Sequence, residues 1–376
     1  MYTKAAEPIR IGTKLVKNRV TFAPTVKFDW TDDTGIAIDR FRRHYEDRAR
    51  GGAGLICVEA TCVERAGRLS PTQLGLWEDG QIAGHRAITE ACRAHGAAVL
   101  VQLHHAGAAT HPQCGPAMGP STGEFRGRTC GELTKERIRE IISAFVSAAE
   151  RARAAGYDGV QLHACHGYLI NQFISPVTNR RTDEYGGSIE NRARFGCEIL
   201  RGIRASCGPD FLLSMRHSAA ETTLEESCAI ADLYVEAGAD YLQISDGIGP
   251  HEVPYPEDYP YNRVCWMGIQ VHDRMKGKVP VSVVNGILTP EQARRLIDDG
   301  LADTVDSARA LLADPNWARG VTEGAEHIPC FNCKACFWSP FMPHRCPAVK
   351  KRHDADPDCC DYTRDDRPIP DFVKKG

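Results

Sequence analysis

The sequence predicts a (β/α)8 barrel, an α/β fold of the TIM-barrel type. Short apolar runs rich in β-branched residues recur eight times over roughly the first 300 residues, and segments with helical spacing separate them. Polar residues and long loops follow several of these runs, as they do at the carboxyl ends of barrel strands. The eight predicted strands are Val20–Ala23, Leu55–Val58, Ala98–Leu103, Gly159–Leu162, Phe211–Met215, Tyr241–Ile244, Val279–Val284 and Asp303–Asp306.

The helices between the strands are marked by their apolar spacing and by their ends. Lys135–Ala155 and Leu224–Ala237 place apolar residues on one helical face, and a further helix is expected from about Ser188. The first two are followed at once by glycines, Gly156 and Gly238, each of which precedes a predicted strand. Strands and helices therefore alternate as a parallel barrel requires.

Two connections are longer than a barrel needs. Gly107–Leu133 follows the third strand and Gly247–Tyr261 follows the sixth. Both leave carboxyl ends of strands, which is the face that carries the active site in barrel enzymes. We expect these two loops to cover a substrate.

Composition excludes several classes of protein. The 376 residues are 42% hydrophobic and 25% charged, with a net charge of −3, so no basic field favours nucleic acid or an acidic membrane. The sequence has no apolar run long enough to span a bilayer and no apolar signal segment at its start. We expect a cytoplasmic protein that forms a homo-oligomer. Of its 16 cysteines, ten are scattered through the barrel as free thiols, and six lie between Cys330 and Cys360.

The stretch from His163 to Phe195 is the most informative part of the chain. It follows the predicted buried strand Gly159–Leu162, and His163, His166 and Tyr168 stand where that strand ends. Two imidazoles and a phenol at a strand terminus contribute little to stability, so they indicate a ligand site.

This stretch, HACHGYLINQFISPVTNRRTDEYGGSIENRARF, resembles the signature of the Old Yellow Enzyme family, the FMN-containing ene-reductases. The resemblance extends over about residues 6 to 320. It implies that residues 1–325 form an FMN-binding TIM barrel.

Residues at other strand ends suit a flavin. Gln102 and Arg216 close the third and fifth strands, and a buried arginine requires an anion or a polarised ring beside it. Asn285-Gly286 and Ala308-Arg309 follow the seventh and eighth strands, where barrel enzymes commonly bind phosphate. The resemblance implies FMN contacts at Pro24, Thr25, Ala60, Gln102, Arg216, Asn285, Gly286, Ala308 and Arg309. Ala308 stands where the family usually has glycine.

The catalytic assignment follows from the chemistry of hydride transfer. A hydride that leaves flavin N5 for an alkene conjugated to a carbonyl builds negative charge on the carbonyl oxygen, which His163 and His166 are placed to stabilise. The second alkene carbon then needs a proton, and Tyr168 is a suitable donor. The resemblance implies the same roles for these residues.

A second feature resembles the 2,4-dienoyl-CoA reductase branch of the family. The segment SDGIGPHE contains His251, which that resemblance makes a second proton donor beside Tyr168. This chain departs from the branch in also carrying His163. The related trimethylamine dehydrogenases have tyrosine at position 163, and many family members have Cys or Thr where this chain has Val26.

Four cysteines after the barrel have the spacing of an iron–sulfur site. Cys330-x2-Cys333-x2-Cys336-x9-Cys346-Pro347 places three thiols close together and a fourth before a proline, which favours a [4Fe-4S] cluster. Four thiolates can also hold Zn²⁺, but zinc sites usually use two CxxC pairs. Residues 326–376 are thus predicted to be a Cys-rich segment with a polar tail, which either wraps over the barrel or a partner, or is disordered.

The sequence therefore predicts an FMN-dependent ene-reductase acting on a double bond conjugated to a carbonyl or a thioester, as in an enone or an acyl-CoA. Electrons would come from NAD(P)H or through the cluster from a separate electron-transfer protein, since no GxGxxG motif follows a strand. Two alternatives remain open. One is an amine or N-methyl dehydrogenase that passes electrons outward through the cluster, and the other is an electron-transfer subunit that only holds FMN.

Overall fold

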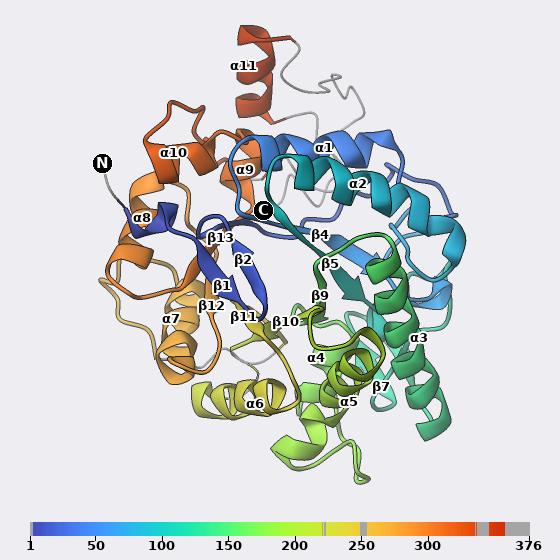
Figure 1. Ribbon diagram of the computed structural model, residues 1–376. Coiled ribbons are helices and arrows are strands. Elements are labelled where there is room, and N and C mark those ends of the chain that lie inside the picture. The colour runs from blue at the N-terminus through green and yellow to red at the C-terminus, as the bar shows by residue number, and fades with distance from the viewer. Residues whose placement is uncertain are drawn as a thin grey trace.

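The computed structural model describes residues 3–219, 221, 223–248, 254–334, 336 and 346–357. Eight parallel strands close into a barrel in the order β10-β11-β12-β13-β3-β4-β5-β9, with β9 paired to β10 (Figure 1). The barrel strands are β3 (Val20–Phe22), β4 (Leu55–Cys62), β5 (Ala98–His104), β9 (Gly159–Ala164), β10 (Leu212–Ser218), β11 (Tyr241–Ser245), β12 (Val281–Val284) and β13 (Thr304–Ser307). All eight predicted strands and the predicted fold are confirmed.

Helices surround the barrel because its strands are buried on both faces and the outer face must be covered. The helices that alternate with strands are α1 (Asp39–Arg50), α2 (Ile82–Ala94), α3 (Lys135–Ala154), α4 (Leu169–Ile174), α5 (Ile189–Cys207), α6 (Leu224–Glu236), α7 (Arg263–Met275), α8 (Pro290–Asp298) and α9 (Arg309–Ala313). Side chains of Thr134, Ser188 and Thr223 cap α3, α5 and α6, which fixes their starts where the sequence predicts them.

The amino end of the barrel is closed by a hairpin that the sequence analysis did not predict. Strands β1 (Ile9–Ile11) and β2 (Lys14–Val16) turn at Gly12, whose φ is +52°, and lie across the barrel in Figure 1. Their apolar residues pack on the first residues of the barrel strands. The members of this plug are Ile9, Ile11, Val16, Leu55, Cys57, Leu100, Leu212 and Tyr241. The plug directs any ligand to the carboxyl end.

The long connection Gly107–Leu133 forms a small sheet rather than the predicted loop. It contains the 3-10 turn η4 (Gly107–Ala109) and the strands β6 (Met118–Gly119), β7 (Gly123–Phe125) and β8 (Arg128–Glu132), in the order β6-β8-β7. The β7–β8 turn places Arg126 and Gly127 at φ +51° and +73°, values typical of a tight hairpin. Short 3-10 turns elsewhere are η1 (Lys4–Ala6), η2 (Arg65–Gly67) and η3 (Asp79–Gln81).

In the described residues after the barrel, the structure has the helices α10 (Trp317–Glu323) and α11 (Pro347–Ala355). The sequence analysis predicted no helix at 347–355; the structure has one there, and Ala348, Val349 and Arg352 are buried. In Figure 1, α11 stands at the edge of the ring of helices. Residues 358–376 lie outside the described part, so the division at residue 325 stays a prediction.

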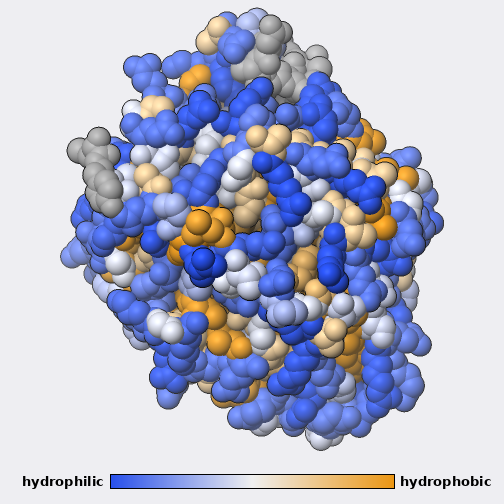
Figure 2. Space-filling view, viewed as in Figure 1, coloured by the Kyte–Doolittle hydropathy of each residue, from blue (hydrophilic) through white to orange (hydrophobic). Residues whose placement is uncertain are grey.

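Within the described ranges, no helix combines the length and the apolar composition that a bilayer crossing requires. Figure 2 shows one face of the molecule, where hydrophilic residues cover most of the surface and apolar residues form small separate patches.

Candidate active site

A cavity of about 210 Å³ opens at the carboxyl ends of β10 to β13. Its lining residues are His166, Arg216, Ser245, Val284, Asn285, Gly286, Ile287, Leu288, Asp306, Ser307, Ala308 and Arg309. Asn285 and Gly286 both have positive φ, +82° and +74°, and a Cβ at Gly286 would lie 2.5 Å from the Nδ2 atom of Asn262. Only glycine fits this turn without strain, so the chain keeps an open backbone cradle here.

Arg216 and Asp306 bring unsatisfied polar atoms to this cavity. Arg216 donates from Nη1 to the carbonyl of Pro24 at 3.5 Å, while its buried Nε has no partner among the described residues. Both carboxyl oxygens of Asp306 are equally buried and lack a partner in the described ranges. Burial raises the pKa of Asp306 to about 7, against the opposing charge of Arg216. Buried polar atoms of this kind mark a place where a ligand completes the hydrogen bonds.

The predicted flavin-binding residues divide into two groups. Arg216, Asn285, Gly286, Ala308 and Arg309 line one cavity. Pro24, Thr25, Ala60 and Gln102 lie on β3, β4 and β5 or just after them, and they do not line it.

Two side chains of this region are held by other protein groups. The Gln102 amide donates to Oε1 of Gln161 at 2.8 Å, and Arg309 donates from Nη1 to Oδ1 of Asn332 at 2.9 Å. The unsatisfied Nε of Arg216 and the open glycine turn suit a cofactor with a polar ring and a phosphate, so the residues present fit FMN.

The segment that carries Thr25 is fixed by buried hydrogen bonds of Lys27 to Thr25 and Glu59. Lys27 donates from Nζ to the carbonyl and hydroxyl oxygens of Thr25, at 2.5 and 2.9 Å, and its backbone N–H donates to Oε1 of Glu59 at 2.6 Å. The other oxygen of Glu59 accepts from the Tyr45 hydroxyl at 2.9 Å. Burial raises the pKa of Glu59 to about 7 and lowers that of Lys27 to about 8. Sequence reasoning missed this pair, although a Lys and a Glu at two neighbouring strand ends were a usable signal.

The three predicted catalytic residues of the central stretch lie together. Nε2 of His163 is 2.9 Å from Nδ1 of His166, and Nε2 of His166 is 2.7 Å from the Ser245 hydroxyl, at the edge of the cavity. The Tyr168 ring packs edge-on against His163, with centroids 4.8 Å apart. Burial lowers the pKa of both imidazoles well below the ordinary value and raises that of Tyr168. The site therefore holds neutral imidazoles and a protonated phenol at neutral pH.

Two further residues belong to this cluster and were not predicted. His104 at the end of β5 is fully buried, 3.1 Å from His163 between their Nδ1 atoms, and its ring lies 4.5 Å from that of Tyr168. Arg126 at the β7–β8 turn donates from Nη2 to the carbonyl of His166 at 2.7 Å, and its guanidinium lies 5.6 Å from the Tyr168 ring. The run His104-His105 at a strand end was the available sequence signal for the first. No sequence signal marked Arg126, because its position beside His166 depends on how the long connection Gly107–Leu133 folds.

The other predicted site residues are His251 and the four cysteines that follow the barrel. His251 lies outside the described residues. Cys330, Cys333 and Cys346 are partly buried free thiols, and Cys336 is exposed. Within the part of the chain that the structure describes, the group of three or more potential metal ligands that it gathers is His163, Cys165 and His166, and the four cysteines do not form one.

Comparison with known proteins identifies the family. The sequence profile of the NADH:flavin oxidoreductase / NADH oxidase family matches residues 5–327. An NADH oxidase of Thermoanaerobacter brockii is 38% identical over 337 residues, which are 86% of this chain and 52% of that protein. An NADPH dehydrogenase of Geobacillus sp. (strain WCH70) is 36% identical over 325 residues, 84% of this chain and 93% of the relative. The chain thus spans about half of the first relative and nearly all of the second.

Solved structures agree with this assignment. The complex of 2-naphthoyl-CoA reductase with 2-naphthoyl-CoA superposes with a TM-score of 0.84 at 30% identity, covering 94% of this chain and 58% of that one. An old yellow enzyme homologue from Zymomonas mobilis superposes with a TM-score of 0.76 at 26% identity, covering 88% and 95%. Sequence profile, relatives and barrel all lead to one conclusion: the chain belongs to the NADH:flavin oxidoreductase / NADH oxidase family, the flavin oxidoreductases of Old Yellow Enzyme type for which FMN is the cofactor.

Proposed function

We propose that this protein reduces a carbon–carbon double bond conjugated to a carbonyl or thioester group. The observation that carries the proposal is the cluster of His163, His166 and Tyr168 beside the cavity that contains Arg216. When bound, FMN supplies the hydride from N5. The chain's own residues bind the cofactor, hold the carbonyl oxygen of the substrate and deliver a proton.

The imidazoles suit the role of holding a developing negative charge. Neutral N–H groups in a buried site stabilise an oxyanion more strongly than they would in water, because no solvent competes for them. Burial keeps His163 and His166 neutral, which avoids a fixed cation that would bind any anion equally well. Arg216 and the Asn285-Gly286 turn hold the polar edge and the phosphate of the cofactor in this proposal.

Tyr168 is the proposed proton donor. Burial raises its pKa, so the phenol stays protonated at neutral pH, while the nearby charge of Arg126 limits that rise. Its ring contacts His104 and His163, which fixes the hydroxyl relative to the oxyanion site. His251 remains the proposed second donor, as in the 2,4-dienoyl-CoA reductase branch.

The substrate and the electron donor are finer parts of the proposal. Likeness to a 2-naphthoyl-CoA reductase in complex with its thioester favours an acyl-CoA or another unsaturated carbonyl compound. Likeness to NADPH dehydrogenases favours NAD(P)H as the donor of electrons. A separate electron-transfer protein is the other source.

The test is a titration of the purified flavoprotein under anaerobic conditions. Reduced by NADH or NADPH, the flavin should regain its oxidised absorbance when an enone or enoyl thioester is added. Bleaching of the oxidised flavin by an amine would instead support the amine dehydrogenase. If the flavin exchanges electrons with neither the enone nor the amine, the result supports an electron-transfer subunit.

Tyr168→Phe tests the assigned proton donor. We expect reoxidation by the enone to slow by about 10²-fold or more, since a positioned general acid contributes on that scale. Tyr234→Phe is the matched control, because the Tyr234 hydroxyl is buried on α6 without a hydrogen-bond partner among the described residues. Equal rates in the two variants contradict the role of Tyr168.

We also propose a [4Fe-4S] cluster on Cys330, Cys333, Cys336 and Cys346. The spacing of the four cysteines in the sequence supports it. Anaerobically purified protein should contain iron and lose it in the variant Cys333→Ser. Cys114→Ser, at a partly buried loop thiol, is the control. Zinc in place of iron, or an unchanged metal content, contradicts the cluster.

A further inference from the structure

The buried imidazoles form a continuous chain of hydrogen bonds. It runs from Nδ1 of His104 to Nδ1 of His163 at 3.1 Å, from Nε2 of His163 to Nδ1 of His166 at 2.9 Å, and from Nε2 of His166 to the Ser245 hydroxyl at 2.7 Å. A neutral imidazole has one N–H and one bare nitrogen, so each ring donates at one side and accepts at the other. Every bond in the chain must therefore point the same way.

Only two arrangements satisfy this condition. In the first, the protons point from Ser245 toward His104, and the junction of His163 and His166 carries its proton on Nδ1 of His166. In the second, they point from His104 toward Ser245, and the same junction carries its proton on Nε2 of His163. In either case the two facing nitrogens share one proton, so only one of the two rings offers an N–H there.

The His104 end of the chain favours the second arrangement, and the Ser245 end is compatible with it. Nε2 of His104 is buried with no partner in the described ranges, and an orphaned N–H is rarer in proteins than an orphaned acceptor. His104 therefore keeps its proton on Nδ1, which faces His163. At the other end, the Ser245 hydroxyl lies 2.7 Å from Nε2 of His166. A hydroxyl oxygen accepts as well as donates, so Ser245 can take the proton of Nε2 of His166 that the second arrangement directs to it.

We propose that His104 is a positioning residue that keeps the shared proton on Nε2 of His163. It makes His163, rather than His166, the ring that offers an N–H at the junction. The catalytic role of this proton rests on the proposed function, in which the N–H of His163 donates to the carbonyl oxygen of the substrate. The position of the proton itself depends on the hydrogen bonds alone.

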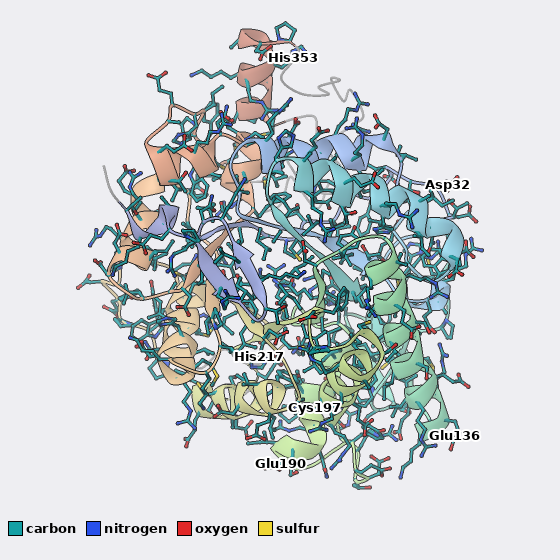
Figure 3. All side chains as sticks on the ribbon, in the orientation of Figure 1. Asp32, Glu136, Glu190, Cys197, His217 and His353 are labelled. Atoms are coloured by element: carbon teal, nitrogen blue, oxygen red, sulfur yellow. The ribbon has the colours of Figure 1, made fainter. Side chains whose placement is uncertain are left out.

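Nuclear magnetic resonance tests the proposal directly, because the ¹⁵N shifts and couplings of a histidine ring distinguish a protonated from a bare nitrogen. The protein, complete with its cofactor, is labelled with ¹⁵N-histidine, and the His163 signal is assigned by its loss in His163→Asn. His85 and His217 are internal references, because their Nε2 atoms lie 3.1 and 3.0 Å from the carbonyls of Gly75 and Ser227 and must donate. His217, labelled in Figure 3, lies on β10 and faces α6. We expect His163 to match their pattern; a proton on Nδ1 of His163 overturns the proposal.

Two substitutions of His104 should either move the His163 proton or leave it in place. His104→Asp offers only acceptor oxygens to Nδ1 of His163, so the proton should move to that atom. His104→Asn keeps an N–H donor in place and should leave the His163 pattern unchanged. An unaltered His163 pattern in His104→Asp contradicts the role of His104, as does a shift in His104→Asn.

The kinetic comparison separates this proposal from the proposed function. With an enone as substrate, kcat in His104→Asp should fall by about 10²-fold, the scale of a lost oxyanion donor, and His104→Asn should recover most of it. If no enone or thioester is turned over, the proposed function fails while the spectra still decide the place of the proton. If His104 had only a packing role, His104→Asp and His104→Asn would have equal kcat at equal thermal stability. That result would contradict the proposal.

Discussion

Replacing Arg181 should loosen the small β6–β8–β7 sheet, whose Arg126 donates to the carbonyl of His166. The Arg181 side chain is 5% exposed and forms a two-bond pair with Asp183, at 3.0 and 2.7 Å. From Nη1 it also donates to the carbonyls of Pro120 and Leu133, at 2.9 and 2.7 Å, near the start and end of the β6–β8–β7 sheet. Arg181, in the motif TNRRTDEYGG, thus links the loop after α4 to the long connection that follows β5.

The size of the effect follows from what the substitution leaves behind. Arg181→Met removes the partner of a partly buried carboxylate and two carbonyls, and breaking a buried charge pair costs about 3–5 kcal/mol. Urea unfolding at pH 7 should show a free energy of unfolding lower by about 4 kcal/mol. Amides of residues 118–133 should also exchange hydrogen faster, because the sheet loses its anchor.

The neighbouring arginine provides the control. Arg180 is exposed and donates to the carbonyls of Thr122 and Val177, so Arg180→Met should cost no more than about 1 kcal/mol. A loss below about 1 kcal/mol in Arg181→Met, or equal exchange in the two variants, would refute the account of Arg181 as the anchor.

Three further outcomes follow from the site. Because burial raises the pKa of Asp306 to about 7, the unfolded chain loses this proton first; stability should fall as pH rises from about 4 to about 7, by at most about 4 kcal/mol, and Asp306→Asn should remove that slope in urea unfolding at pH 5 and pH 8. Arg126→Met removes a cation that limits the raised pKa of Tyr168, so the alkaline limb of the pH–kcat profile should move upward; an unmoved limb contradicts the contact. Gly286→Ala should weaken FMN binding at least tenfold by fluorescence titration, about 1.4 kcal/mol, whereas Gly300→Ala, also at positive φ but in open space, should not.

The barrel was predictable because its signals are local and repeated. Each strand is buried on both faces, which leaves short apolar runs such as Leu55–Val58, and the helices between them carry polar caps and terminal glycines. The hairpin β1–β2 was missed because three-residue strands give too little alternation to distinguish them from a loop. Helix α11 was missed because few of its residues are apolar.

The site was predictable only where the residues share a strand or a motif. His163, His166 and Tyr168 are near neighbours in sequence, so their joint position at one strand end needed no knowledge of the fold. Their partners come from other elements: His104 from β5 and Arg126 from a distant hairpin. Such contacts depend on how strands are ordered around the barrel, which no local pattern records.

The pairing of β3 with β13 joins segments that the ribosome makes far apart in time. The Thr21 hydroxyl donates to the carbonyl of Val305, 284 positions later in the chain. One edge of β3 therefore has no strand partner until nearly the whole barrel has been synthesised. At about 5–20 residues per second, that wait lasts roughly 15–60 s, during which a nascent chain exposes unpaired strand edges. Yield in a heterologous host should therefore respond to cooler growth and to chaperones that shield emerging polypeptides.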